Sequence, residues 1–181
     1  LYFPKLSKKE LKYYMNTFMN INDNLKPELE LANGSVMNLK NIIEYNRIEK
    51  LNLIVETTFN LNITSFEKSV DTLSKINKSD KKELIIYLNY LKTVANDMFK
   101  LSIKTNSSSI QLTFMISKYR IMLDEFPNTK WDNIIYAIDQ TIIDISGNVN
   151  PNLTFYALFI NIYKCLKGDK LNLIKKQLLK E

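Results

Sequence analysis

The chain has 181 residues, a net charge of +6 and no histidine, and it contains a single cysteine, Cys165. Without histidine it cannot form a Ser-His-Asp triad, a Cys-His pair or a His-ligated zinc site. Its three glycines are too few and too widely spaced for a GxGxxG turn or a phosphate-binding loop. The composition therefore predicts a protein that is not an enzyme, with no catalytic residue, no metal and no cofactor.

The positive charge lies at the two ends of the chain. Residues 1–12 carry a net +3 and residues 164–181 a net +4, so the segment between them is nearly neutral. Only two arginines occur, Arg47 and Arg120, although nucleic-acid sites favour arginine for bidentate contacts. The charge pattern therefore argues against nucleic acid as a partner.

Capping residues followed by apolar residues at helical spacing predict a series of helices. One helix is expected from 109 to 126. Gly147 and Gly168 are each expected to end the helix that precedes them. The other predicted helices start near Ser7, Ser35, Thr64, Asp80, Thr129, Pro151 and Asp169.

These signals predict an all-α fold with at least about 60% helix. The expected architecture is one domain over residues 1–181, a compact irregular bundle of seven or eight helices. Residues 153–166 are apolar on nearly every side, so this helix is expected at the centre of the bundle. Its predicted core residues are Phe155, Phe159, Ile162 and Leu166.

The segment 28–38 is compatible with two structures. Alternating apolar residues on either side of Asn33-Gly34 are typical of a hairpin with a type I′ turn. The alternative is a short helix or an extended linker that ends at Gly34. Within the single predicted domain, residues 25–35 are the part expected to form this hairpin or linker.

Two groups of side chains could carry chemistry. Cys165 lies between Lys164 and Lys167, whose ammonium groups would favour a thiolate. However, it belongs to the most apolar helix, which favours a buried structural role. Asp132, Tyr136 and Asp139 share one helix face and could bind a cation or exchange protons, but a solvated polar face has the same pattern.

Two further groups of side chains could bind a partner or a surface. Tyr2, Phe3, Tyr13 and Tyr14 form an aromatic cluster, which either packs back onto the bundle or binds a partner. The other group is basic and follows Asp169, where a short amphipathic helix is expected. Its side chains could contact an anionic surface, and they are Lys170, Lys175, Lys176 and Lys180.

We expect a non-catalytic helical module that binds another protein. The alternative is a membrane-associated or membrane-active helical protein that uses the apolar helix 153–166 and the basic segment after it. That helix is shorter than the roughly 20 residues of a membrane span. Because the chain begins at Leu1 without a methionine, we expect an exported or surface-facing protein whose leader has been removed.

Overall fold

The computed structural model describes residues 4–21, 25–45, 47–59, 63–79, 81–103, 109–147 and 149–169, with the backbone alone at 63–66, 77 and 79. Helix accounts for 81% of these residues, and none of them lies in a strand. The predicted all-α class is therefore confirmed. Nine α-helices are present in the described residues, rather than seven or eight.

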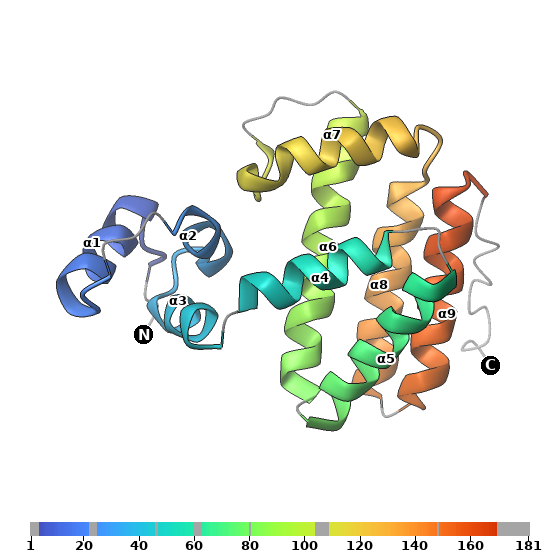
Figure 1. The fold of residues 1–181 in the computed structure, drawn as a ribbon, viewed down its shortest axis with the longest axis horizontal. Coiled ribbons are helices and arrows are strands. Elements are labelled where there is room, and N and C mark those ends of the chain that lie inside the picture. The colour runs from blue at the N-terminus through green and yellow to red at the C-terminus, as the bar shows by residue number, and fades with distance from the viewer. Residues whose placement is uncertain are drawn as a thin grey trace, which may run out of the picture.

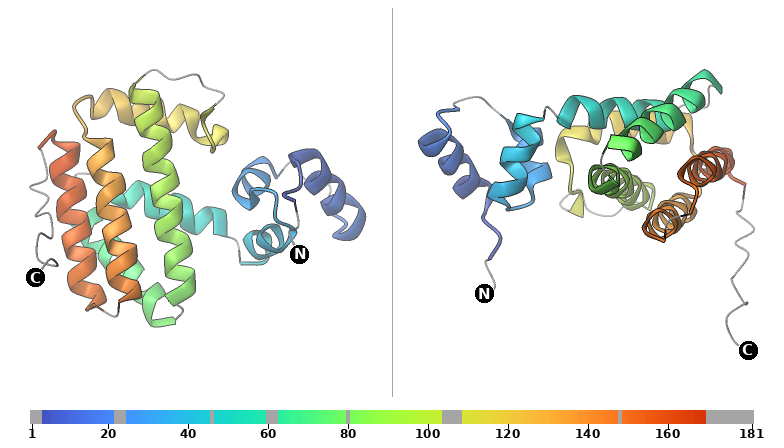
Figure 2. Two further views of the ribbon diagram at one scale, coloured as in Figure 1. Left: turned by 180° about the vertical axis from the view of Figure 1, so that it is seen from behind. Right: turned by 90° about the horizontal axis from the view of Figure 1, so that it is seen from below.

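The helices follow one another with short connections. Their bounds are α1 (Lys8–Phe18), α2 (Lys26–Ala32), α3 (Val36–Glu44), α4 (Arg47–Thr58), α5 (Ile63–Ser79), α6 (Lys81–Ser102), the 3-10 helix η2 (Thr113–Met115), α7 (Ile116–Glu125), α8 (Trp131–Ser146) and α9 (Pro151–Leu166). The long helices α6, α8 and α9 run side by side as one layer, and α4, α5 and α7 cover one face of it (Figures 1 and 2). Helices α1–α3 gather beyond the start of α4 (Figure 1).

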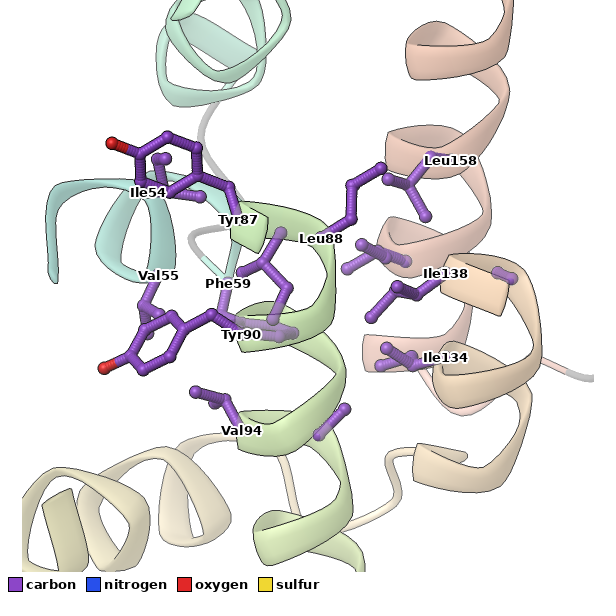
Figure 3. Close-up of a cluster of buried hydrophobic side chains, with 14 of the residues drawn as sticks. Ile54, Val55, Phe59, Tyr87, Leu88, Tyr90, Val94, Ile134, Ile138 and Leu158 are labelled. Carbon is purple, nitrogen blue, oxygen red and sulfur yellow. The ribbon is translucent and has the colours of Figure 1, made fainter. Parts of the chain in front are cut away.

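The large hydrophobic core lies between α6, α8 and α9 and the helices that cover them. Helix α6 contributes eight buried residues to it and contacts α4, α5, α7 and α8. From α8, the fully buried Trp131 packs its ring 5.7 Å from that of Phe59. Figure 3 shows side chains of α4, α6, α8 and α9 meeting in this core.

Helix α9 is not confirmed as the centre of the fold. Its predicted core residues Phe155, Phe159, Ile162 and Leu166 are all buried, as expected. Its opposite side is exposed, and α9 contacts only α8 and α5 extensively among the described elements. Helix α9 lies at the end of the layer, so one of its sides stays in solvent whatever its composition. The helix that contacts the largest number of other helices in the large core is α6.

The prediction of a hairpin at 28–38 is wrong, and the alternative of a short helix is confirmed, with α2 ending at Ala32, two residues before Gly34. Leu29 and Ala32 of α2 and Leu39 of α3 are buried at helical spacing, which a hairpin would not allow. Between the two helices Asn33 and Gly34 have φ values of 47° and 83°.

Gly34 also permits a close approach of the N-terminal segment. Its carbonyl accepts a hydrogen bond of 3.0 Å from the Leu6 N–H. A Cβ atom at position 34 would lie 2.6 Å from the Lys5 Cβ. Glycine is therefore needed here both for its positive φ and for its missing side chain.

The predicted helix ends are confirmed in several cases. Ser7 and Glu10 form a reciprocal capping box on α1, and Ser35 accepts a hydrogen bond from the Asn38 N–H at the start of α3. Pro151 occupies the first turn of α9, and Gly147 is the C-cap of α8. The predicted caps at Thr64, Asp80 and Asp169 fall wholly or partly outside the described residues.

The predicted cap at Thr129 is wrong. Helix α8 begins at Trp131 with no side-chain cap. The Thr129 hydroxyl instead donates to the Phe126 carbonyl at 2.8 Å, and the Lys130 N–H donates to the Cys165 carbonyl at 3.1 Å. The chain is therefore anchored to the end of α9 before α8 starts.

Helices α1–α3 have a hydrophobic cluster of their own, which we call the N-terminal cluster. In the described residues its buried members are Leu11, Met15, Leu29, Ala32, Leu39 and Ile42. Leu31 packs against both this cluster and the large core. The single domain over 1–181 stays a prediction. The described residues contain two hydrophobic clusters, the N-terminal cluster and the large core.

Candidate functional site

The exposed side of α9 carries a regular apolar stripe, which we call the α9 face. Leu153, Tyr156, Ile160 and Tyr163 follow one another at spacings of three, four and three residues, so they line one side of the helix. Their exposed fractions are 67%, 44%, 47% and 39%. The other side of α9 packs into the core, so the face is held on a rigid element.

The surroundings of the α9 face are mixed in polarity. Lys164 and Lys167 are exposed beside it, and the Lys167 ammonium lies 4.5 Å from the centroid of the Tyr163 ring. A shallow groove of about 90 Å³ separates α9 from α8, and it is lined partly by Gln140 and Asn161. This arrangement can bind an apolar surface with polar groups at its edge.

Sequence reasoning missed the α9 face because it treated 153–166 as apolar all round. The usable signal was the interruption by Lys164, which is exposed on the solvent side of the helix. Periodicity identifies that side, but it does not say that large apolar residues remain there uncovered.

The predicted aromatic cluster is only partly described. Tyr13 is 67% exposed on α1. Tyr14 is half-buried, with its ring centroid 5.1 Å from that of Phe18 and 5.8 Å from the Lys40 ammonium. Tyr14 thus packs within α1–α3. Tyr2 and Phe3 lie outside the described residues, as do the basic residues Lys170, Lys175, Lys176 and Lys180.

Cys165 is fully buried, in line with the structural role favoured by its apolar helix. Burial, together with the negative charges of Asp132 and Asp169, raises the pKa of its thiol to about 11. The thiol is therefore protonated at neutral pH, and the neighbouring lysines do not produce a thiolate.

The polar face of α8 resembles an ordinary solvated surface. Asp132 and Tyr136 are exposed, and the Asp139 carboxylate accepts a hydrogen bond of 2.6 Å from the Lys92 ammonium. Within the described ranges, no group of three acidic or cysteine side chains could hold a metal ion. In the same ranges, no helix is long and apolar enough to cross a membrane.

Two buried carboxylates were not foreseen from the sequence. The Glu30 side chain, from α2, is fully buried and accepts hydrogen bonds from the Thr113 hydroxyl and, at 3.3 Å, from the Phe114 N–H. Asp97, on α6, accepts the backbone N–H groups of Gln111 and Leu112 at 3.0 and 2.9 Å. The two carboxylates together thus fix residues 111–114.

The charge of Glu30 is stabilised where it is buried. Desolvation is the largest influence on its pKa and would raise it. The hydrogen bonds from Thr113, the Lys8 ammonium and Phe114, with the positive charge of Lys8, outweigh desolvation and hold the pKa below its ordinary value. Glu30 is therefore ionised at neutral pH and ties α2 to η2. No sequence signal distinguishes it from the exposed acids around it.

Comparison with protein-family models, with curated proteins and with solved structures finds no match to this chain.

Proposed function

We propose that this chain is a non-catalytic helical module and that the α9 face binds an amphipathic helix of another protein. The observation that carries the proposal is the stripe of four large apolar side chains on the outer side of a well-packed helix. Side chains at this spacing match the apolar residues of a second helix laid along them.

The chemistry of the described residues supports a binding role over a catalytic one. Cys165 is buried and protonated, and Asp139 is paired with Lys92. Two of the four residues of the α9 face are tyrosines, and tyrosine is enriched in the energetic centres of protein interfaces. In this proposal the exposed lysines beside the stripe contribute to the polar rim.

The second candidate is attachment of the α9 face to an anionic membrane surface. It is favoured by Lys164 and Lys167, which are exposed beside the apolar stripe, as in helices that lie in the membrane interface. In this case α9 would stay packed on α8 and α5 and would not span the bilayer.

The two candidates can be separated by photo-crosslinking in cells that naturally contain the protein. A photoreactive amino acid replaces Ile160 on the α9 face or, as the matched control, Ile121 of α7, which is 66% exposed. We expect a discrete protein crosslink from position 160 and none from 121. Adding Leu153→Asp should remove the crosslink while the helix content stays native, because Leu153 is 67% exposed.

Sedimentation with phosphatidylglycerol-containing vesicles provides the second measurement. If the wild type sediments with these vesicles and Leu153→Asp does not, while position 160 gives no protein crosslink, the membrane candidate is correct. A crosslink of equal strength from both positions, or no crosslink and no sedimentation, contradicts the binding function of the α9 face.

A further inference from the structure

A cleft separates α2 and α3 from α4 and α6, on a different part of the molecule from the α9 face. Its volume is about 240 Å³. Apolar walls are supplied by Leu31, Ile42 and Leu51, and side-chain amides by Asn38 and Asn89. The cleft is therefore lined by helices of both hydrophobic clusters.

In the part of the chain that the structure describes, Arg47 is the only charged residue that lines this cleft. Its Nε–H is buried without a hydrogen-bond partner, and among the described residues no carboxylate forms an ion pair with it. The centre of its guanidinium lies 5.5 Å from the Tyr45 ring centroid. A buried N–H without an acceptor is unfavourable, and Arg47 gives the wall of the cleft a positive charge that no carboxylate of the described residues pairs with.

Tyr90 supplies a second unmatched group in the wall of the same cleft. The residue is 4% exposed, and its hydroxyl is buried without a hydrogen-bond partner. Figure 3 shows the Tyr90 ring pointing away from α8 and α9, toward the side of α6 where α4 and α7 lie. This hydroxyl is covered by protein atoms and is subject to the negative charge of Asp97, so the ligand contact of the cleft falls to Arg47.

The type of acceptor follows from the donors. A guanidinium offers a planar pair of N–H groups that matches the two oxygens of a carboxylate. Among the described residues no aspartate or glutamate lines the cleft, and the negative charge of the buried Asp97 acts on its Tyr90 side. The remaining walls are apolar or amide-bearing and suit a short hydrocarbon group.

We propose that this cleft binds a small carboxylate with a short apolar tail. The carboxylate lies on the Arg47 guanidinium, and the tail packs on Leu31, Ile42 and Leu51. The available volume fits a molecule of the size of hexanoate. Because the walls come from α2 and α3 and from α4 and α6, the bound ligand also holds the N-terminal cluster against the large core.

The test is a titration of the isotope-labelled protein with hexanoate, followed by nuclear magnetic resonance. Hexanamide, which has the same tail but no charge, is the matched ligand. We expect saturable shifts of the amides of Asn38, Asn89 and Tyr90 with hexanoate, and an affinity at least about tenfold lower for hexanamide.

Variants assign the charge recognition to Arg47. Arg47→Gln should remove the preference for hexanoate over hexanamide, and Arg47→Lys should restore it only in part, because an ammonium lacks the planar fork. Arg120→Gln is the control, since Arg120 is the other arginine of the chain and is exposed on α7.

Three results would overturn the proposal. They are equal binding of hexanoate and hexanamide, loss of hexanoate binding in Arg120→Gln as well, and no saturable shift up to the solubility limit of hexanoate. Unchanged shifts outside the cleft show that Arg47→Gln is folded. If that variant is misfolded, the comparison of the two ligands on the wild type still decides the outcome.

Discussion

Helices α1–α3 and α4–α9 are built on very different amounts of buried surface. In the described residues the N-terminal cluster has six buried apolar side chains, whereas the large core has thirty. A unit of about 40 residues rarely folds alone without a disulfide, a metal or a partner surface. The smaller unit therefore depends on the larger one, and the contacts of Glu30 and Leu31 join them.

Stability should therefore be distributed unevenly between the two units. The large core should set the global free energy of unfolding, and α1–α3 should open locally at a lower cost. Three substitutions, one in each unit and one at the junction, separate these contributions.

The largest effect is expected for Phe159→Ala in the large core. Phe159 is 3% exposed, and its truncation leaves a cavity, so the free energy of unfolding should fall by about 3–5 kcal/mol. Urea denaturation followed by circular dichroism measures this loss. A loss below about 1 kcal/mol would show that α9 is not packed as described.

An intermediate effect is expected for Glu30→Gln at the junction. The loss should be about 1–3 kcal/mol at neutral pH, because buried donors lose their charged acceptor. Hydrogen exchange should show faster opening of α1–α3, while α8 and α9 keep their protection.

The same variant has a distinct dependence on pH. Since folding lowers the Glu30 pKa from 4.5, its contribution is present above pH 4.5 and is lost as the pH falls through the folded pKa. The wild type should therefore lose stability in this acid range more steeply than Glu30→Gln. Parallel curves for the two proteins would contradict a charged Glu30 at the junction.

The smallest effect on global unfolding is expected for Leu11→Ala in the N-terminal cluster. Leu11 is fully buried, so α1–α3 should lose their protection against hydrogen exchange. The free energy of opening measured at the most slowly exchanging amides of α6 should fall by about 1 kcal/mol or less. If Leu11→Ala destabilises α6 as strongly as Phe159→Ala does, the two clusters unfold as one unit and the comparison fails.

Local chemistry made several parts of the fold predictable. The hydroxyls of Ser7 and Ser35 cap helices because each can reach a backbone N–H two or three residues ahead. The apolar periodicity of α6, from Leu84 to Met98, identified a face that is buried in the structure. These features depend on residues within one or two helical turns.

The features that sequence reasoning missed depend on residues far apart in the chain. Glu30 is buried because Thr113 and Phe114 reach it, and no local pattern encodes that contact. The α9 face is exposed because no described helix covers it. Thr129 does not cap α8, because the preceding chain is anchored to α9 through Lys130 and Cys165.

The contact between Glu30 and Thr113 joins residues 83 positions apart. Chains are synthesised from the N-terminus, so α1–α3 leave the ribosome well before the residues that receive Glu30. Closing so long a loop costs entropy that only the assembled core can offset. Helices α1–α3 should therefore be the last part of the protein to reach their final position, after residues 111–114 have docked on Asp97.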